Sequence, residues 1–160
     1  MSDTVASHLM VTLPRQLTRL YINVDNLSKS KHNELLHSVH SKLTCLQKLY
    51  VKGSPYPGDL VKHGGLALVS CTQLHWLELI LPSSCDDLIP EDCVATFMKG
   101  MQQARSIKNL YLDGVHLDRR SFDELTRLSE RKCLDELGFS RRLLPEDVQS
   151  EELDDFVTLY

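Results

Sequence analysis

The chain repeats one short pattern of aliphatic positions. In the first copy, Leu17, Leu20 and Ile22 lie three and then two residues apart, and the residues that flank the last two are polar or aromatic. Such alternation is typical of a strand that buries one side. Four further copies follow, Leu46/Leu49/Val51, Leu74/Leu77/Leu79, Ile107/Leu110/Leu112 and Leu134/Leu137/Phe139. The pattern predicts five short strands with equivalent sides buried.

The spacing between copies is nearly constant, because their starts lie 27 to 33 residues apart. Periods of roughly 20–29 residues are typical of leucine-rich repeats, in which each strand is followed by a return segment and no repeat buries its apolar side alone. We therefore predict an α/β fold of about five repeats. It should be a leucine-rich-repeat solenoid, or horseshoe, with parallel strands on the concave face and helices on the convex face.

The first two return segments differ in quality. Residues 31–42 carry aliphatic side chains three and four positions apart, which predicts a helix capped by Ser28 or Ser30 with its histidines on the outer side. A second helix is expected over residues 59–71. Gly64-Gly65 in its interior costs about 1 kcal/mol per glycine relative to alanine, so we expect this helix to be short or irregular. Admission of a close neighbour is the alternative role of the two glycines.

The later return segments begin with recognisable helix signals. A loop from Pro82 to Pro90 accounts for the longest gap, and Pro90 should stand in the first turn of the next helix. Ser121 and Glu124 have the spacing of a capping box at the start of the following one. A last helix is expected after Pro145, with an acidic outer side that suits a terminal repeat.

Residues 1–160 are expected to form a single domain. Residues 1–16 resemble the end of an earlier, incomplete repeat, because His8–Leu13 is similar to the segments that precede Leu46 and Leu74. We therefore expect the chain to be a fragment of a larger protein. Full repeats should start near residues 17, 46, 74, 107 and 134.

Charge and hydropathy argue against nucleic acid and membrane as partners, which leaves a protein as the expected partner. The net charge is −4 with both signs interspersed, so no basic surface for nucleic acid is expected. The apolar runs are far shorter than the roughly 18 residues of a membrane helix, and no signal peptide is recognisable. Five cysteines without paired spacing favour a reducing, cytoplasmic location. Three of them precede repeat starts, where a buried structural side chain fits: Cys45, Cys71 and Cys133.

No arrangement of side chains indicates an enzyme. His37 and His40 lie three residues apart, ahead of Cys45, but a further metal ligand at a familiar spacing is missing, so we expect surface histidines. The carboxylates of residues 86–92 lack the alternating order of a calcium loop. Phosphate-binding and nucleophile motifs are absent from the sequence. We predict no catalytic residue, no metal site and no cofactor.

The residues that alternate with the buried aliphatics should face outward along the concave sheet. The middle outward position is tyrosine in three of five copies, and the single tryptophan lies beside it. Tyrosine, tryptophan and arginine are enriched at binding hot spots, although aromatic residues also favour strands as such. Bases precede acids along the copies, an order that could orient a protein partner or a second copy of the chain. The candidate protein-binding residues are Arg19, Tyr21, Lys48, Tyr50, Trp76, Glu78, Tyr111 and Asp113.

The repeats also resemble a known family. The runs Leu17-Thr-Arg-Leu20-Tyr-Ile22, Leu46-Gln-Lys-Leu49-Tyr-Val51 and Ile107-Lys-Asn-Leu110-Tyr-Leu112 are similar to the irregular C-terminal leucine-rich repeats of NOD-like receptors. These are intracellular innate immune sensors, and the similarity is to their inhibitor-of-apoptosis-related or CARD-bearing members. The resemblance implies a ligand-sensing or autoinhibitory region of an inflammasome-type receptor. Its partner would be a protein ligand or a neighbouring domain of the same receptor.

Two alternatives stay open beside the receptor. The ninth position of the repeat, usually asparagine, varies here, as it does in F-box and tropomodulin-like repeats. One alternative is therefore a substrate-recognition module of an F-box-type ubiquitin ligase, or a free-standing adaptor. The other is an enzyme or metal-binding protein that uses His37, His40 and Cys45. The ninth positions are Asp25, Ser54, Pro82, Val115 and Arg142.

Overall fold

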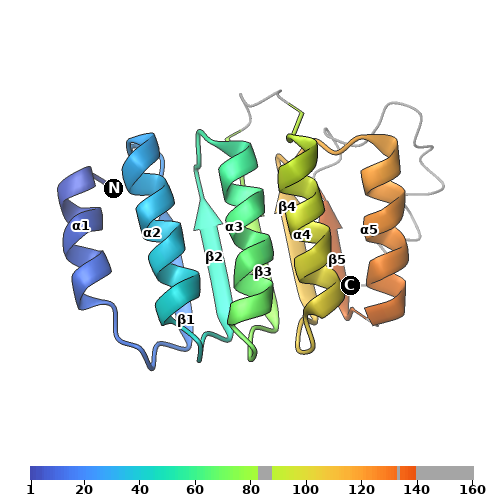
Figure 1. Ribbon diagram of the computed structural model, residues 1–160, viewed down its shortest axis with the longest axis horizontal. Helices are drawn as coiled ribbons and strands as arrows, with labels where there is room; N and C mark the ends of the chain where they lie inside the picture. The colour runs from blue at the N-terminus through green and yellow to red at the C-terminus, as the bar shows by residue number, and fades with distance from the viewer. Residues whose placement is uncertain (83–87, 133, 140–160) are drawn as a thin grey trace.

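Helices and strands alternate along the chain in the computed structural model, which describes residues 1–82, 88–132 and 134–139 (Figure 1). Predictions about residues 83–87, 133 and 140–160, including Cys133 and the helix after Pro145, lie outside the described residues. The elements are α1 (Asp3–Thr12), β1 (Arg19–Asn23), α2 (Lys29–Lys42), β2 (Lys48–Lys52), α3 (Pro57–Ser70), β3 (Trp76–Ile80), α4 (Glu91–Gln103), β4 (Asn109–Asp113), α5 (Arg119–Lys132) and β5 (Glu136–Phe139).

The five described strands form one parallel sheet in the order β1-β2-β3-β4-β5. Equivalent positions of the repeated pattern pair with one another, so that Leu20 lies opposite Leu49, and Leu49 opposite Leu77. Parallel neighbours require a crossover connection, which each intervening helix supplies. The α/β class and the parallel sheet are therefore confirmed, and the structure adds that the five copies pair in register.

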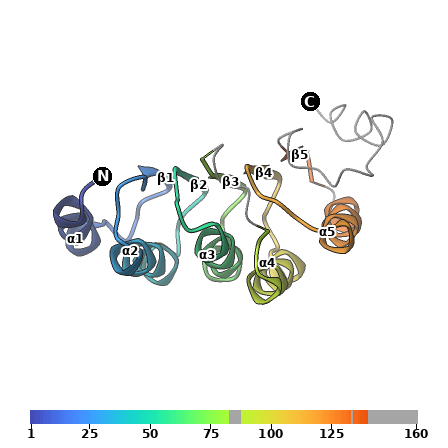
Figure 2. The same ribbon diagram turned by 90° about the horizontal axis from the view of Figure 1, so that it is seen from above.

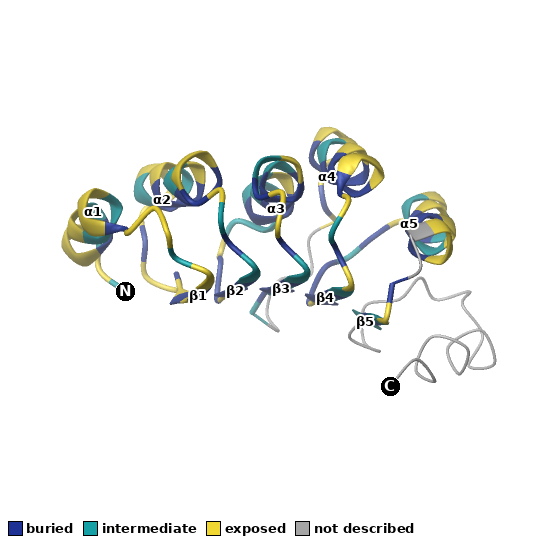
Figure 3. Cartoon of the chain, turned by 90° about the horizontal axis from the view of Figure 1, so that it is seen from below, coloured by how far each residue is buried: buried dark blue, intermediate teal, exposed yellow. Residues whose placement is uncertain are grey.

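The helices lie in a row over one face of this sheet (Figure 2). In the described part of the chain no helix covers the other face, which we call the open face. Buried residues line the space between the strands and the helices (Figure 3). Among residues 1–82, 88–132 and 134–139, none of the helices has the length and apolar character needed to cross a lipid bilayer.

Helix α2 forms where the aliphatic spacing predicts it. Leu35, Leu36 and Val39 are all buried against the sheet layer. Of the two caps considered, Ser28 is the N-cap, and its hydroxyl accepts a hydrogen bond from the backbone N–H of Lys31 at 3.4 Å. The helix consequently starts two residues earlier than expected.

The prediction of a short or irregular helix at the paired glycines is wrong. Helix α3 is a continuous helix of 14 residues. A Cβ atom on Gly65 would lie 2.6 Å from the Cα atom of Phe97, and one on Gly100 would lie 2.3 Å from the carbonyl oxygen of Gly65. The glycines thus allow α3 and α4 to pack backbone to backbone, and this packing outweighs the propensity cost of about 1 kcal/mol per glycine.

Two helix starts also differ from the prediction. Pro90 is the N-cap of α4 and precedes its first turn. The carboxylate of Asp118 accepts a hydrogen bond from the backbone N–H of Ser121 at 2.7 Å, so α5 starts before the predicted capping box. This bond holds the pKa of Asp118 below its usual value. The Ser121 and Glu124 box is therefore wrong, because an aspartate three residues upstream caps the helix first.

Candidate protein-interaction face

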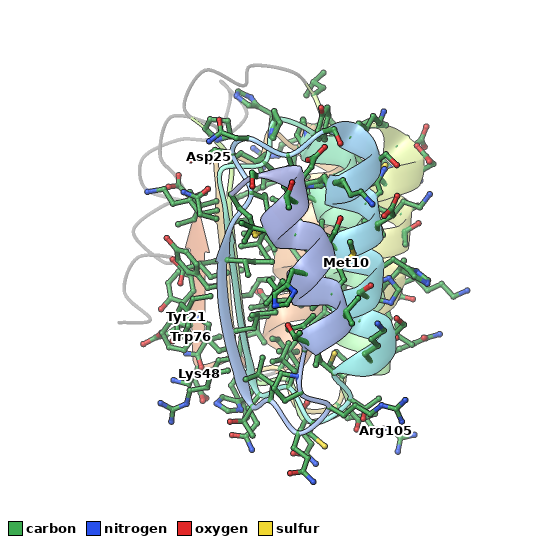
Figure 4. All side chains as sticks on the ribbon, turned by 90° about the vertical axis from the view of Figure 1, so that its left-hand side faces the viewer. Met10, Tyr21, Asp25, Lys48, Trp76 and Arg105 are labelled. Atoms are coloured by element: carbon green, nitrogen blue, oxygen red, sulfur yellow. The ribbon has the colours of Figure 1, made fainter. Side chains whose placement is uncertain are left out.

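The open face carries the side chains that alternate with the buried aliphatics of each strand. In strand β1, for example, Leu20 and Ile22 are buried while Tyr21 is 65% exposed. Tyr21, Lys48 and Trp76 project from the sheet on the side away from the helices (Figure 4). The open face consists of Arg19, Tyr21, Asn23, Lys48, Tyr50, Lys52, Trp76, Glu78, Ile80, Asn109, Tyr111, Asp113, Glu136 and Gly138.

Strand register brings all eight predicted binding residues onto this one surface. Each outward position lies beside its equivalents in the neighbouring strands, which forms three rows across the sheet. The first row is Arg19, Lys48, Trp76, Asn109 and Glu136. The middle row is Tyr21, Tyr50, Glu78, Tyr111 and Gly138, and the last is Asn23, Lys52, Ile80 and Asp113.

Two aromatic pairs occupy the open face. The rings of Tyr21 and Tyr50 have centroids 5.7 Å apart, and those of Trp76 and Tyr111 are 5.2 Å apart. Lys48 Nζ lies 4.7 Å from the centroid of the Trp76 ring, within cation–π range. These contacts hold large amphipathic side chains at the surface, where Tyr21 is exposed and Tyr50, Trp76 and Tyr111 are half-buried.

Glu78 and Glu136, two acidic side chains of the face, form hydrogen bonds with their neighbours. Glu136 accepts hydrogen bonds from Asn109 Nδ2, at 2.8 Å, and from the hydroxyl of Tyr111. Trp76 Nε1 donates to a carboxylate oxygen of Glu78 at 3.3 Å. These bonds make the outward sides of β3, β4 and β5 a polar, hydrogen-bonded surface.

Charge is segregated across the face in the order expected from the sequence. The outward residues of β1 and β2 include three bases and no acid, whereas those of β3 to β5 include three acids and no base. The bases are Arg19, Lys48 and Lys52, and the acids are Glu78, Asp113 and Glu136. A surface of this kind can orient a partner by its charges.

The histidine and cysteine candidates do not form a metal site in the described part of the chain, where no group of three metal-binding side chains occurs. His37 is exposed, but His40 is only 7% exposed, so the prediction of a surface histidine is wrong for His40. Its ring lies between those of His37 and His63, with centroid distances of 5.0 and 5.3 Å. Burial lowers the pKa of both His40 and His63 to about 4.

The prediction that the histidines of α2 lie on its outer side is also wrong for His32, which is buried. Its Nε2 lies 2.8 Å from the hydroxyl oxygen of Ser54, and its ring meets the edge of Tyr56. Burial lowers the pKa of His32. Its position three residues before Leu35 and four before Leu36 was the available signal, because residues at those spacings share one side of a helix.

The predicted structural cysteines differ in exposure. Cys71 is buried, and burial raises the pKa of its thiol to about 11, as expected for an inert side chain packed inside the fold. Cys45 is only half-buried. The prediction of a buried position is therefore confirmed for Cys71 alone.

The larger hollows of the surface lie on the helix layer, away from the open face. One of about 620 Å³ lies between α4 and α5, and its lining includes Gln102, Arg120, Glu124 and Arg127. Another, of about 640 Å³, includes Val69 and Arg105 at the ends of α3 and α4. Charged and glutamine side chains form most of the lining of the hollow between α4 and α5.

No family model, curated protein or solved structure matches the chain.

Proposed function

We propose that this chain is a non-enzymatic protein-interaction domain that binds a partner through its open face. Tyr21, Tyr50, Trp76 and Tyr111 are the anchors. The observation that carries the proposal is the presence of two aromatic pairs on a sheet face that no described helix covers. Aromatic side chains bury large areas at small entropic cost, which is why they dominate binding energy at protein interfaces.

The architecture in this proposal is a leucine-rich-repeat solenoid. Its support is the repeat spacing of 27 to 33 residues, the in-register pairing of equivalent positions and the row of helices on one face. Together with the sequence resemblance, these features favour the ligand-sensing or autoinhibitory repeat region of a cytoplasmic NOD-like receptor. The partner is then a protein ligand or a neighbouring domain of the receptor.

The irregular ninth positions of the repeats favour a second candidate. It is a substrate-recognition module of an F-box-type ubiquitin ligase, or a free-standing adaptor, which would use the same face. Sequencing the native transcript upstream of the codon for Met1 distinguishes the candidates. A nucleotide-binding module encoded there identifies a receptor, and an F-box identifies a ligase subunit.

A photo-crosslinking experiment tests the location of the interface and identifies the partner. Benzoylphenylalanine is placed at Tyr21 on the open face and, as a control, at Lys62, which is exposed on α3. Crosslinks to one defined protein should form from position 21 and not from position 62. Crosslinks from position 62 alone would place the interface on the helices.

Substitution of one residue from each aromatic pair then tests the anchors. The double variant Tyr50→Ala with Tyr111→Ala should weaken binding of the crosslinked partner at least about tenfold, because two anchors are lost. Isothermal titration measures the affinity, and circular dichroism checks that the variant still unfolds cooperatively. Lys62→Ala with Lys99→Ala, both on the helix layer, is the matched control. Equal affinity of the aromatic double variant and the wild type contradicts the proposed face.

A further inference from the structure

We propose that one half of the open face binds an acidic peptide segment with a central bulky apolar side chain, presented by a partner protein. This basic half consists of Arg19, Tyr21, Lys48, Tyr50 and Lys52 on β1 and β2. The inference rests on the proposed function and names the chemistry of the partner at the same face.

The cations of the basic half are not neutralised by ion pairs within the described residues. Arg19 and Lys48 are direct neighbours in the register of β1 and β2, and like charges in such positions repel. Among the described residues, no ion pair joins Arg19, Lys48 or Lys52 to a carboxylate. Asp25, which follows β1, and Asp113, in the last row of the open face, are acids at the end of the strands where Lys52 lies. An anionic ligand would relieve the repulsion at the other end.

The spacing of the basic half matches an extended peptide. Lys48 and Lys52 are four residues apart on one strand, which corresponds to about 13 Å. The Tyr21 and Tyr50 rings, 5.7 Å apart, occupy the middle position between them. In an extended peptide, residues i, i+2 and i+4 point to one side with the same spacing. Acidic residues at i and i+4 can therefore reach the cations while an apolar residue at i+2 covers the tyrosines.

The rest of the open face favours a peptide over a nucleic acid. Cations beside aromatic rings can also bind single-stranded nucleic acid. A phosphate backbone continuing across the sheet, however, would meet the carboxylates of Glu78, Asp113 and Glu136 on the next three strands. A short acidic segment avoids this repulsion, and a larger partner can place its basic groups there.

Fluorescence anisotropy of the full chain tests the proposal with three labelled pentapeptides. Glu-Ser-Phe-Ser-Glu should bind saturably, with Kd below about 1 mM. Lys-Ser-Phe-Ser-Lys reverses the charges and Glu-Ser-Gly-Ser-Glu removes the apolar group, and neither should bind. Added salt should weaken the binding, because exposed charges are screened. Equal binding of all three peptides, or none of the first, overturns the proposal.

Variants of the chain locate the binding. Arg19→Glu and Lys52→Glu should each weaken binding of the acidic peptide at least about tenfold. Lys62→Glu makes the same charge change on the helix layer and should leave the affinity unchanged. Arg19→Gln and Lys52→Gln serve as milder changes if a charge reversal unfolds the chain. Equal loss with Lys62→Glu would indicate a nonspecific charge effect and overturn the proposal.

Two further outcomes separate this inference from the proposed function. If oligothymidine binds more tightly than the acidic peptide and loses affinity in the same variants, the ligand of the basic half is nucleic acid and the peptide proposal fails. If no peptide binds while Tyr50→Ala with Tyr111→Ala still weakens binding of the crosslinked partner, the open face remains the interface and only its acidic ligand is wrong.

Discussion

Three histidines at the contact between α2 and α3 are held largely out of water. His32 is fully buried and shares a hydrogen bond with the hydroxyl of Ser54. His40 Nε2 and His63 Nδ1 are buried without a hydrogen-bond partner within the described residues. An imidazole in such a site stays neutral, because the charged form would lose its hydration without gaining a partner.

The stability of the chain should therefore fall in mild acid. The pKa values of His40 and His63 are about 4 in the folded state, below the ordinary value of 6.5 expected on unfolding. The unfolded state binds more protons between these values, so the contribution of the two histidines to the free energy of unfolding should be present above pH 6.5 and be lost as pH falls towards 4. The slope is at most about 1.4 kcal/mol per pH unit for each histidine.

Urea unfolding followed by circular dichroism between pH 7.5 and 4.5 measures this slope. The hydrogen-bonded carboxylate of Asp118 has a lowered pKa. Its contribution to the free energy of unfolding is lost only below this pH range, so it does not add to the slope that the histidines produce. His40→Leu should flatten the slope, whereas His37→Leu, at an exposed position, should leave it nearly unchanged. A stability that does not change over this interval would show that the buried histidines are protonated equally in both states.

At the residue scale, the open face was more predictable than the interior. Period-2 alternation assigned Tyr21 and Lys48 to the outward side correctly, because adjacent strand residues must point to opposite sides. His32 and His40 were assigned to the outside of α2 because histidine is polar. Their burial depends on Ser54 and on α3, which approach only in the folded chain.

Helices α3 and α4 pack backbone to backbone where Gly65 meets Gly100. Gly100→Ala should destabilise the chain by about 2 kcal/mol, because the added methyl group meets the backbone of Gly65 and neither backbone can move without disturbing the other. The gain in helix propensity of up to about 1 kcal/mol offsets only part of this cost. Thermal and urea unfolding measure the net effect.

Lys99→Ala is the matched control, since Lys99 precedes Gly100 on α4 and is exposed. It should change the free energy of unfolding by less than about 0.5 kcal/mol. A Gly100→Ala variant as stable as the wild type would mean that α3 and α4 can separate at little cost. The close glycine contact would then not be needed for the packing of the two helices.

At the element scale, the presence of a helix or strand was easier to predict than the residues at which it begins and ends. The aliphatic spacing located all five strands and α2. Burial of one side places aliphatic residues at every second position of a strand and at every third or fourth position of a helix. Gly65 was misjudged since its cost is local and visible in the sequence, whereas its benefit comes from Gly100, 35 positions later. The start of α5 was misplaced because two capping residues, Asp118 and Ser121, competed within one turn.

Across the whole molecule, each described strand pairs only with the strands next to it in sequence. If the stability of residues 1–82, 88–132 and 134–139 is the sum of such neighbouring interfaces, as in repeat proteins, it should differ from one end of the sheet to its middle. Strand β3 is covered on both edges, whereas β1 has a strand partner on one edge only among the described residues. Local opening should therefore be easiest at β1 and α1 and hardest around β3.

Hydrogen exchange with paired substitutions tests this gradient. Leu77 in β3 and Leu20 in β1 occupy equivalent buried positions, and truncation of either to alanine should cost about 2–5 kcal/mol locally. Leu77→Ala should lower amide protection throughout the described strands, because it weakens the interfaces on both of its sides. Leu20→Ala should lower it in α1, β1 and α2 and leave β3 and β4 nearly unchanged. Equal loss of protection from both variants at every amide would instead indicate one cooperative unit, in which the repeats do not unfold separately.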